Sequence, residues 1–327
     1  MTFKAPFWSP SQASAALFDW DGVIAETNLD FTEVRKKYFG GRPAMLLEDM
    51  ASLEPAARAG LKRDLEDMEL RGAERARFVP GAEAVLEWVG RSGIPWAVVS
   101  RNCGKSIEKA AAVMGMTLPR TVRSRDDGRC VKPDPRALCE VCGELSADPA
   151  QTLLIGDHIY DMMGARRAGM RGVLVRSEIA PGWEKWLELR CRSMSELLSE
   201  LSSASEIVPW EYQETVLRFG RKFLASAYKI TLKIPETCKP SLDSWIAAAA
   251  SLGVGGFEPP DGRFEPSCWK SSPSFDPSYM GLDMKEAVRR FLRTRWPFAS
   301  VREGGGSLEP PPRADELADF VESAAGA

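Results

Sequence analysis

Four short segments, far apart in the chain, carry residue types suited to handling phosphate. They are Phe18-Asp19-Trp20-Asp21-Gly22-Val23, Val99-Ser100-Arg101-Asn102, Lys132-Pro133, and Ile155-Gly156-Asp157 with Asp161. One carboxylate can attack phosphorus, a second can move a proton, and an ammonium group can hold a phosphoryl oxygen. Clustered carboxylates suit Mg²⁺ rather than Zn²⁺. Together the four segments predict a magnesium site that performs covalent phosphoryl transfer.

The first segment offers two carboxylates on one side of the backbone. Asp19 and Asp21 are two residues apart on an extended chain, so their side chains leave the same face, and Gly22 permits a sharp exit. Lys132 would screen the repulsion between a phosphoryl group and Asp19. Without the cation and Lys132, several carboxylates packed together would raise one another's pKa values and weaken the nucleophile.

The other two segments supply donors and further acids. The Ser100 hydroxyl and the Asn102 amide can donate to phosphoryl oxygens, and Asp157 and Asp161 can bind the metal. Each motif alone is commonly a strand end, a loop or a helix cap. The prediction therefore rests on the combination of all four, each of which follows a predicted strand.

Short apolar strands alternate with helices through the first two hundred residues. Strands are expected at 15–18, 94–99, 152–155 and 171–176, with a weakly apolar one within 118–125. Helices are expected at 29–39, 43–50, 54–76, 82–90, 105–114, 135–145, 162–168 and 195–201. This alternation predicts a Rossmann-like α/β fold, with a parallel sheet covered on both faces and ligands beyond its carboxyl edge.

The alternation stops after the serine-rich stretch at 202–205. Helices are then expected at 210–224, 242–252, 283–296 and 313–325, a half-buried strand at 228–234, and a long loop at 253–281. The sequence therefore predicts a catalytic domain at 1–205, with a helical cap inserted at about 25–78, and a separate α+β domain at 206–327.

The four motifs, in this order, resemble those of the haloacid dehalogenase (HAD) superfamily, and within it the phosphatases, over about residues 14–202. The resemblance implies a HAD core with a small helical C1 cap, as in phosphoglycolate-phosphatase-like members. It implies that Asp19 is the nucleophile that forms an aspartyl-phosphate and that Asp21 is the general acid and base. Ser100 and Lys132 match the residues of the second and third family motifs.

The resemblance also implies a Mg²⁺ cofactor. The metal ligands that it implies are Asp19, Asp21 through its main-chain carbonyl, Asp157, and Asp161 as ligand or as a partner of the ligands. The residues expected to border the phosphate are Gly22, Arg101 and Asn102. His158 stands where the family usually has a smaller polar residue, and we expect it to cap the following helix rather than to contact substrate.

The composition of the chain bears on which partners it binds and on where in the cell it lies. The net charge of −3 gives no argument for nucleic acid or an anionic membrane, and no apolar run reaches the roughly 20 residues of a membrane span. The N-terminus lacks a signal-peptide pattern, and the seven cysteines are expected to be reduced, so we expect a cytoplasmic protein. Cys139 and Cys142 form a CxxC inside a predicted helix without further zinc ligands.

The predicted function is a Mg²⁺-dependent phosphatase acting on a small phosphorylated metabolite. One alternative is a phosphomutase of the beta-phosphoglucomutase-like branch, whose cap is usually larger. Dehalogenase and phosphonatase activities are disfavoured, because neither needs Asp21. Another alternative is a HAD scaffold whose C-terminal domain binds a protein partner or associates with itself.

Three charged segments could bind partners or substrate, or could be ordinary solvent-exposed surfaces. The basic helix at 283–296 could dock an acidic partner, although we favour a solvated amphipathic helix with Val288, Phe291 and Leu292 inward. Candidates for a second anionic group of the substrate are Arg35, Lys36, Lys37 and Arg42, which surface solvation explains equally well. The residues expected to form a solvated acidic face are Asp64, Glu66, Asp67 and Glu69.

Overall fold

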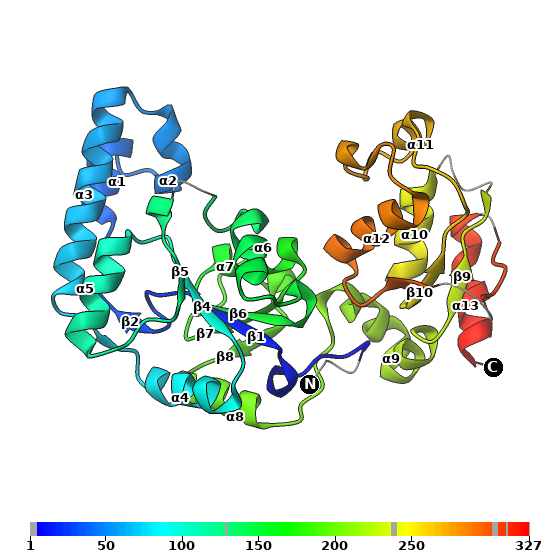
Figure 1. The fold of residues 1–327 in the computed structure, drawn as a ribbon, viewed down its shortest axis with the longest axis horizontal. Coiled ribbons are helices and arrows are strands. Elements are labelled where there is room, and N and C mark those ends of the chain that lie inside the picture. Colours follow the sequence, from blue (N-terminus) through cyan, green and yellow to red (C-terminus); the bar gives the residue numbers. More distant parts are fainter. Residues whose placement is uncertain (1–4, 128–129, 237–240, 303–306, 312, 327) are drawn as a thin grey trace.

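A six-stranded parallel sheet lies in the middle of the molecule, with a helical cap at one end and a C-terminal region at the other (Figure 1). The computed structural model describes residues 5–127, 130–236, 241–302, 307–311 and 313–326. In their order across the sheet, the strands are β5 (Thr121–Arg123), β4 (Trp96–Val99), β1 (Ala15–Phe18), β6 (Thr152–Gly156), β7 (Arg171–Val175) and β8 (Leu189–Cys191). This confirms the predicted parallel α/β fold.

Helices cover both faces of the sheet. Alternate strand residues point to opposite faces, so Phe18 and Ile155 pack on one side, while Leu17 and Leu154 pack on the other. The first face is covered by α4 (Ala82–Ser92), α5 (Gly104–Met114) and α8 (Met194–Ser202). The second face is covered by α6 (Pro135–Glu144) and α7 (Ile159–Ala168). Burial on both faces explains the continuous apolar strands.

Two edge strands are short. The weak strand expected within 118–125 is β5, which has three residues. The sequence pattern predicts no strand at 189–191, where the structure has β8. Leu189 and Cys191 flank Arg190, and three residues with a central charge give too short a pattern to identify a strand.

The cap is inserted through a two-stranded antiparallel ribbon. Its strands are β2 (Ala25–Glu26) and β3 (Arg77–Phe78), and between them lie α1 (Thr32–Phe39), α2 (Leu46–Asp49) and α3 (Pro55–Ala73). These helices have their own small core, made of Val34, Phe39, Leu46, Met50, Leu61 and Leu65. The ribbon follows β1 directly, and Glu48 of α2 pairs with Arg101, which follows β4, so the cap lies beside the carboxyl ends of these two strands.

The C-terminal region contains a second sheet, which is also parallel. Its strands are ordered β11 (Ser300–Val301), β10 (Gly256–Glu258) and β9 (Thr231–Lys233). The helices of this region are α9 (Gln213–Ala227), α10 (Leu242–Ser251), α11 (Pro266–Ser271), α12 (Met284–Arg295) and α13 (Leu317–Gly326). Among the described residues, short 3₁₀ helices lie at Pro10–Gln12, Met50–Ser52, Arg125–Asp127, Pro149–Gln151, Glu184–Trp186, Trp210–Tyr212, Pro277–Tyr279 and Ala314–Glu316. The division of the chain at residue 205 stays a prediction.

The long loop expected at 253–281 is wrong, because this segment contains the central strand β10 and helix α11. Strand β10 begins with Gly256, and a glycine does not contribute to the apolar pattern by which strands are predicted. A Cβ on Gly256 would lie 2.3 Å from Oγ1 of Thr231 on the neighbouring strand. Residue 256 is therefore glycine because the two strands approach closely, and the apolar alternation that marks a strand is lost.

The basic helix α12 is amphipathic, as we expected from the sequence at 283–296. Val288, Phe291 and Leu292 are buried. Arg289 and Arg290 are exposed and pair with Glu286 on the same helix, at 2.6 and 2.8 Å. Arg289 and Arg290 thus lie on a solvated face and have a partner on their own helix.

A buried ion cluster joins the main sheet to the C-terminal region. The Arg171 guanidinium on β7 lies 2.9 Å from Glu188 and 3.1 Å from Glu211, and all three side chains are at most 2% exposed. Glu211 belongs to the 3₁₀ helix that precedes α9, and the ring of Phe298 lies 4.6 Å from the guanidinium. Burial raises the pKa of Glu188 to about 7 even though Arg171 lowers it. Arg171 thus pairs with both of these buried acids.

Arg171→Met should destabilise the protein by about 3–5 kcal/mol, because it leaves two buried carboxylates without their cation. Urea denaturation followed by tryptophan fluorescence measures the loss. Arg190→Met is the matched control on the adjacent strand, since Arg190 pairs with Glu178, which is 95% exposed. That control should cost less than about 1 kcal/mol. Equal losses in the two variants would show that the buried cluster does not hold the regions together.

The structure also bears on the expectations about membrane spans and cysteines. None of their helices has both the length and the apolar character to cross a membrane. Six cysteines are free thiols, including Cys139 and Cys142 of the CxxC, whereas Cys238 lies outside the described residues.

Candidate active site

The four predicted segments meet at the carboxyl edge of the main sheet. Asp19 and Asp21 follow β1, Ser100 follows β4, and Asp157 follows β6. The Asp19 amide donates to the Ile155 carbonyl at 2.9 Å, which holds the ends of β1 and β6 together. The strand order reverses between β1 and β6, and ligands of open α/β sheets bind at such a reversal.

Lys132 lies between two of the acids. Its Nζ is 2.8 Å from Oδ1 of Asp19 and 2.6 Å from Oδ1 of Asp161, and its side chain is fully buried. Burial alone would lower the pKa of Lys132, but Asp161 and Asp19 together raise it. The ammonium group therefore stays charged and orients the Asp19 carboxylate.

The two oxygens of Asp19 have different surroundings. Oδ1 accepts the Trp20 amide at 2.7 Å and faces Lys132, whereas Oδ2 has no hydrogen bond or ion pair with any residue that the structure describes. Burial raises the pKa of Asp19 to about 6, although Lys132 opposes the shift. One carboxylate oxygen is thus held in place while the other is free to react.

Asp21 is held by Thr27. Its Oδ1 accepts the Thr27 amide at 3.2 Å and also the Thr27 hydroxyl. Burial raises the pKa of Asp21 to about 6, and the two Thr27 hydrogen bonds oppose the shift. A carboxyl group that titrates near neutral pH can both give and take a proton.

Asp157 has the most strongly perturbed carboxyl group. Burial raises its pKa to about 8, and the charges of Asp19 and Asp161 add to the shift. Oxygens of Asp19, Asp157 and Asp161 all lie within 4.8 Å of one another. Gly22, with a φ of +76°, adjoins this cluster, where a Cβ would lie 2.0 Å from Oδ2 of Asp157. An all-oxygen donor set with uncompensated negative charge fits a hard divalent cation such as Mg²⁺.

The helix that follows β6 begins with a reciprocal cap. Nδ1 of His158 accepts the Tyr160 amide at 3.3 Å, and Oδ2 of Asp161 accepts the His158 amide at 3.1 Å. The predicted capping role of His158 is therefore confirmed, and His158 also lines the cavity, so the expectation that it does not contact substrate stays a prediction. Because Asp161 also faces Lys132, both of its oxygens have protein partners.

The second segment is only partly directed into the cavity. Oγ of Ser100 accepts the Asn102 amide at 3.1 Å, and both residues are buried. Asn102 and Arg101 line the cavity, whereas Ser100, Lys132 and Gly22 lie outside its lining. Arg101 makes a two-pronged ion pair with Glu48 of the cap, with both N–O distances at 2.8 Å.

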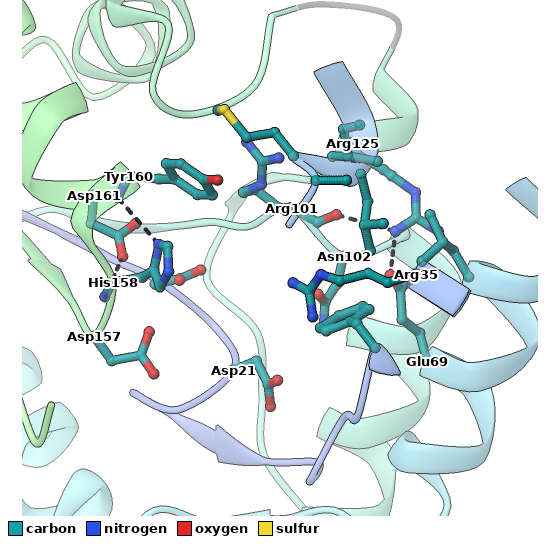
Figure 2. A pocket seen from close by; sticks show the side chains of 17 residues that line it. Asp21, Arg35, Glu69, Arg101, Asn102, Arg125, Asp157, His158, Tyr160 and Asp161 are labelled. Atoms are coloured by element: carbon teal, nitrogen blue, oxygen red, sulfur yellow. Dashed lines mark hydrogen bonds and ion pairs between the residues drawn. The ribbon is translucent and has the colours of Figure 1, made fainter. Parts of the chain in front are cut away.

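A cavity of about 350 Å³ opens between these residues and the cap (Figure 2). Its lining includes the acids Asp19, Asp21 and Asp157, further charged and polar side chains, and a group of apolar ones. The apolar lining residues are Phe31, Ala44, Met45, Leu46, Leu47 and Leu65. The volume suits a small molecule, with its charged end toward the strand ends.

Glu69, Arg125 and Tyr160 line the cavity but were not predicted from the sequence. Glu69 was expected on a solvated face, but it is 2% exposed, pairs with Arg125 and accepts the Cys103 amide at 2.9 Å. The expectation of an exposed Glu69 is therefore wrong. Leu61, Leu65 and Glu69 follow one another at four-residue spacing, so the apolar stripe of α3 already included this position.

Comparison with known proteins agrees with this geometry. The family model for haloacid dehalogenase-like hydrolases matches residues 16–175. An N-acetylmuramic acid 6-phosphate phosphatase of Pseudomonas aeruginosa is 29% identical over 187 residues, which cover 50% of this chain and 81% of the relative. A phosphoglycolate phosphatase of Cupriavidus necator is 27% identical over 186 residues, covering 50% and 80%.

Among solved structures, a hydrolase from Pseudomonas syringae has the same fold. It superposes with a TM-score of 0.52 at 20% sequence identity, covering 59% of this chain and 99% of that protein. The part of the chain that the family model matches runs from β1 to β7 and includes the cap and the four motifs. Residues 16–175 of the chain therefore belong to the haloacid dehalogenase-like hydrolase family.

Proposed function

We propose that the protein is a Mg²⁺-dependent phosphatase that hydrolyses a small phosphomonoester through an aspartyl-phosphate on Asp19. The observation that carries this proposal is the Asp19 carboxylate, with Oδ1 held by Lys132 and the Trp20 amide and Oδ2 left free beside the cavity. Phosphatase names among the relatives support the same reaction class.

In the first step, Oδ2 of Asp19 attacks phosphorus and the bond from phosphorus to the alcohol oxygen breaks. Asp21 gives its proton to the departing alcohol, which leaves a phosphorylated Asp19 and an ionised Asp21. In the second step, Asp21 takes a proton from a water molecule that attacks phosphorus. Inorganic phosphate leaves, Asp19 is regenerated, and Asp21 again holds a proton.

The pKa of Asp21, about 6, supports this double role, because both protonation states are accessible near neutral pH. Thr27 fixes the carboxyl group through one oxygen. The other oxygen is then available to the substrate or to water.

Asp19, Asp157 and the main-chain carbonyl of Asp21 would hold Mg²⁺, with Asp161 as a further ligand or a supporting partner. When bound, the cation supplies positive charge that offsets the phosphoryl oxygens and the clustered acids. Lys132 adds a second positive charge beside Asp19. Asn102 lines the cavity, and its side-chain amide is available to donate to a phosphoryl oxygen.

The substrate is proposed to be a small soluble metabolite. The cavity of about 350 Å³ is too small for a nucleic acid or a folded protein segment. The two relatives are named for different phosphate esters, so their names support the reaction and not one substrate. The six free thiols fit the reducing conditions of the cytoplasm.

Phosphate release is expected from at least one class of small phosphomonoester when Mg²⁺ is present. A panel of phosphate esters of sugars, alcohols and hydroxy acids, assayed for inorganic phosphate, tests this. Chelation with EDTA should abolish release and added Mg²⁺ should restore it, because the uncompensated acids around Asp19 weaken the nucleophile.

Release that is insensitive to EDTA would contradict the metal dependence. Isomerisation of a bisphosphorylated sugar without phosphate release would favour the phosphomutase alternative. No release from any ester with Mg²⁺ present would contradict the proposed function.

A further inference from the structure

Three arginines line the active-site cavity, and two of them are neutralised by the protein itself. Arg101 pairs through both terminal nitrogens with Glu48, and its guanidinium lies 4.7 Å from the centre of the Tyr160 ring. Arg125 pairs with the buried Glu69. These ion pairs join the cap to the core, because Glu48 and Glu69 come from α2 and α3.

Arg35 differs from the other two. It is half-buried on α1 and lines the cavity, and it forms no ion pair with any residue in the described part of the chain. Figure 2 shows its guanidinium directed into the cavity from the side opposite Asp157 and His158. The guanidinium carbon of Arg35 lies 5.8 Å from the centre of the Phe31 ring.

The neighbouring cations of the cap are unlike Arg35. Lys36 pairs with Glu33 at 2.7 Å and Lys37 pairs with Asp64 at 2.6 Å, both on the outer surface. Arg42 is exposed and stacks on Phe39. Of the four basic residues that the sequence offered for an anionic group, only Arg35 lines the cavity.

We propose that Arg35 binds a carboxylate of the substrate, so that the enzyme acts on phosphomonoesters that also carry a carboxylic acid. This inference rests on the proposed phosphatase function. The phosphoryl group lies at Asp19 and the carboxylate at the cap end of the same cavity. Arg35 is then a specificity-determining residue.

The charges and the lining favour a carboxylate over a second phosphate. One unpaired guanidinium carries one positive charge, and a carboxylate carries one negative charge and matches the guanidinium fork with two hydrogen bonds. A second phosphoryl group would bring an excess negative charge next to the apolar side chains of Met45, Leu46 and Leu47.

Matched pairs of esters test the proposal on the full-length protein with Mg²⁺. Phosphoglycolate is compared with ethyl phosphate, and 3-phosphoglycerate with glycerol 3-phosphate, which differ by the carboxylate alone. We expect kcat/KM to favour the acid of each pair by roughly 10- to 100-fold, the effect of a charged hydrogen-bonded pair. Fructose 1,6-bisphosphate against fructose 6-phosphate tests the second phosphate.

Arg35→Gln should remove the preference for the carboxylated esters, and Arg35→Lys should retain only part of it because an ammonium cannot bind two oxygens in one plane. Lys36→Gln is the matched control one residue along α1, where the side chain is exposed and paired with Glu33. It should leave the ratio within each pair unchanged.

Three results would overturn the proposal: equal kcat/KM for both members of each pair, a preference for the bisphosphate, or an equal loss for all esters in Arg35→Gln. The last would place Arg35 on the transferred phosphoryl group. Calorimetry separates this proposal from the reaction itself. Tighter binding of phosphoglycolate than of ethyl phosphate, lost in Arg35→Gln, would uphold the carboxylate site even in a protein that released no phosphate.

Discussion

Asp19→Asn is expected to lower the rate of phosphate release by at least about 10³-fold, because an amide cannot form the acyl-phosphate bond. The proposed nucleophilic atom is Oδ2 of Asp19, since Oδ1 is held by Lys132 and the Trp20 amide. Steady-state assays of phosphate release measure the loss. Mass spectrometry after rapid acid quench should detect a phosphorylated peptide containing Asp19 in the wild type and none in the variant.

Asp134→Asn is the matched control for this change. Asp134 lies two residues after Lys132, caps α6 by accepting the Arg136 amide at 2.9 Å, and does not line the cavity. Asn also caps helices well, so activity should be retained. Substantial turnover in Asp19→Asn, or a phosphorylated residue other than Asp19, would contradict the proposed nucleophile.

Lys132→Met should impair both activity and stability. The side chain is fully buried between Asp19 and Asp161, so its removal leaves two carboxylates without their cation. We expect a loss of about 3–5 kcal/mol in the free energy of unfolding in EDTA. The rate of phosphate release should fall by roughly 10²-fold or more, because the charge beside the phosphoryl group is lost.

The destabilisation should grow with pH. The pKa of Asp19 is already raised from 3.8 to about 6 with Lys132 present, and removing the ammonium raises it further. A raised carboxyl pKa favours the folded state below that pKa, and this contribution is lost as the pH rises through the window from about 4 upward. Urea denaturation of Lys132→Met in EDTA should therefore show a larger deficit at pH 8 than at pH 5.

Lys109→Met provides the comparison for an exposed lysine. Lys109 is 40% exposed on α5 and pairs with Glu74 at 2.7 Å, so its removal should cost less than about 1 kcal/mol at either pH. If Lys132→Met were as stable and active as Lys109→Met, the buried ammonium would have no role in holding the acids.

Much of the core site could be predicted from the sequence because its determinants are local. Apolar runs of four to five residues form the buried strands, and the polar residues that end them must lie at one edge of a parallel sheet. The structure accordingly brings Asp19, Lys132 and Asp161 into contact. The cap by His158 was also predictable, since it depends on the start of one helix.

The small sheet of the C-terminal region shows the opposite case. Strand β10 was missed because Gly256 is required by the approach of Thr231 from another strand, and glycine erases the apolar pattern. Likewise, the buried partner of Arg171 includes Glu211, forty residues away, which no local pattern connects to β7.

The cap end of the cavity was decided by tertiary structure alone. Arg35, Lys36 and Lys37 are alike in the sequence. Lys36 pairs with Glu33 on its own helix, but only the packing of α1 against α3 gives Lys37 its partner Asp64 and places Arg35 at the cavity. The sequence by itself determined the reaction end of the site, because strand ends and motifs are local properties of the chain. Only the folded structure decided which charge remains unpaired to meet a substrate, because ion pairing depends on distances between elements far apart in the sequence.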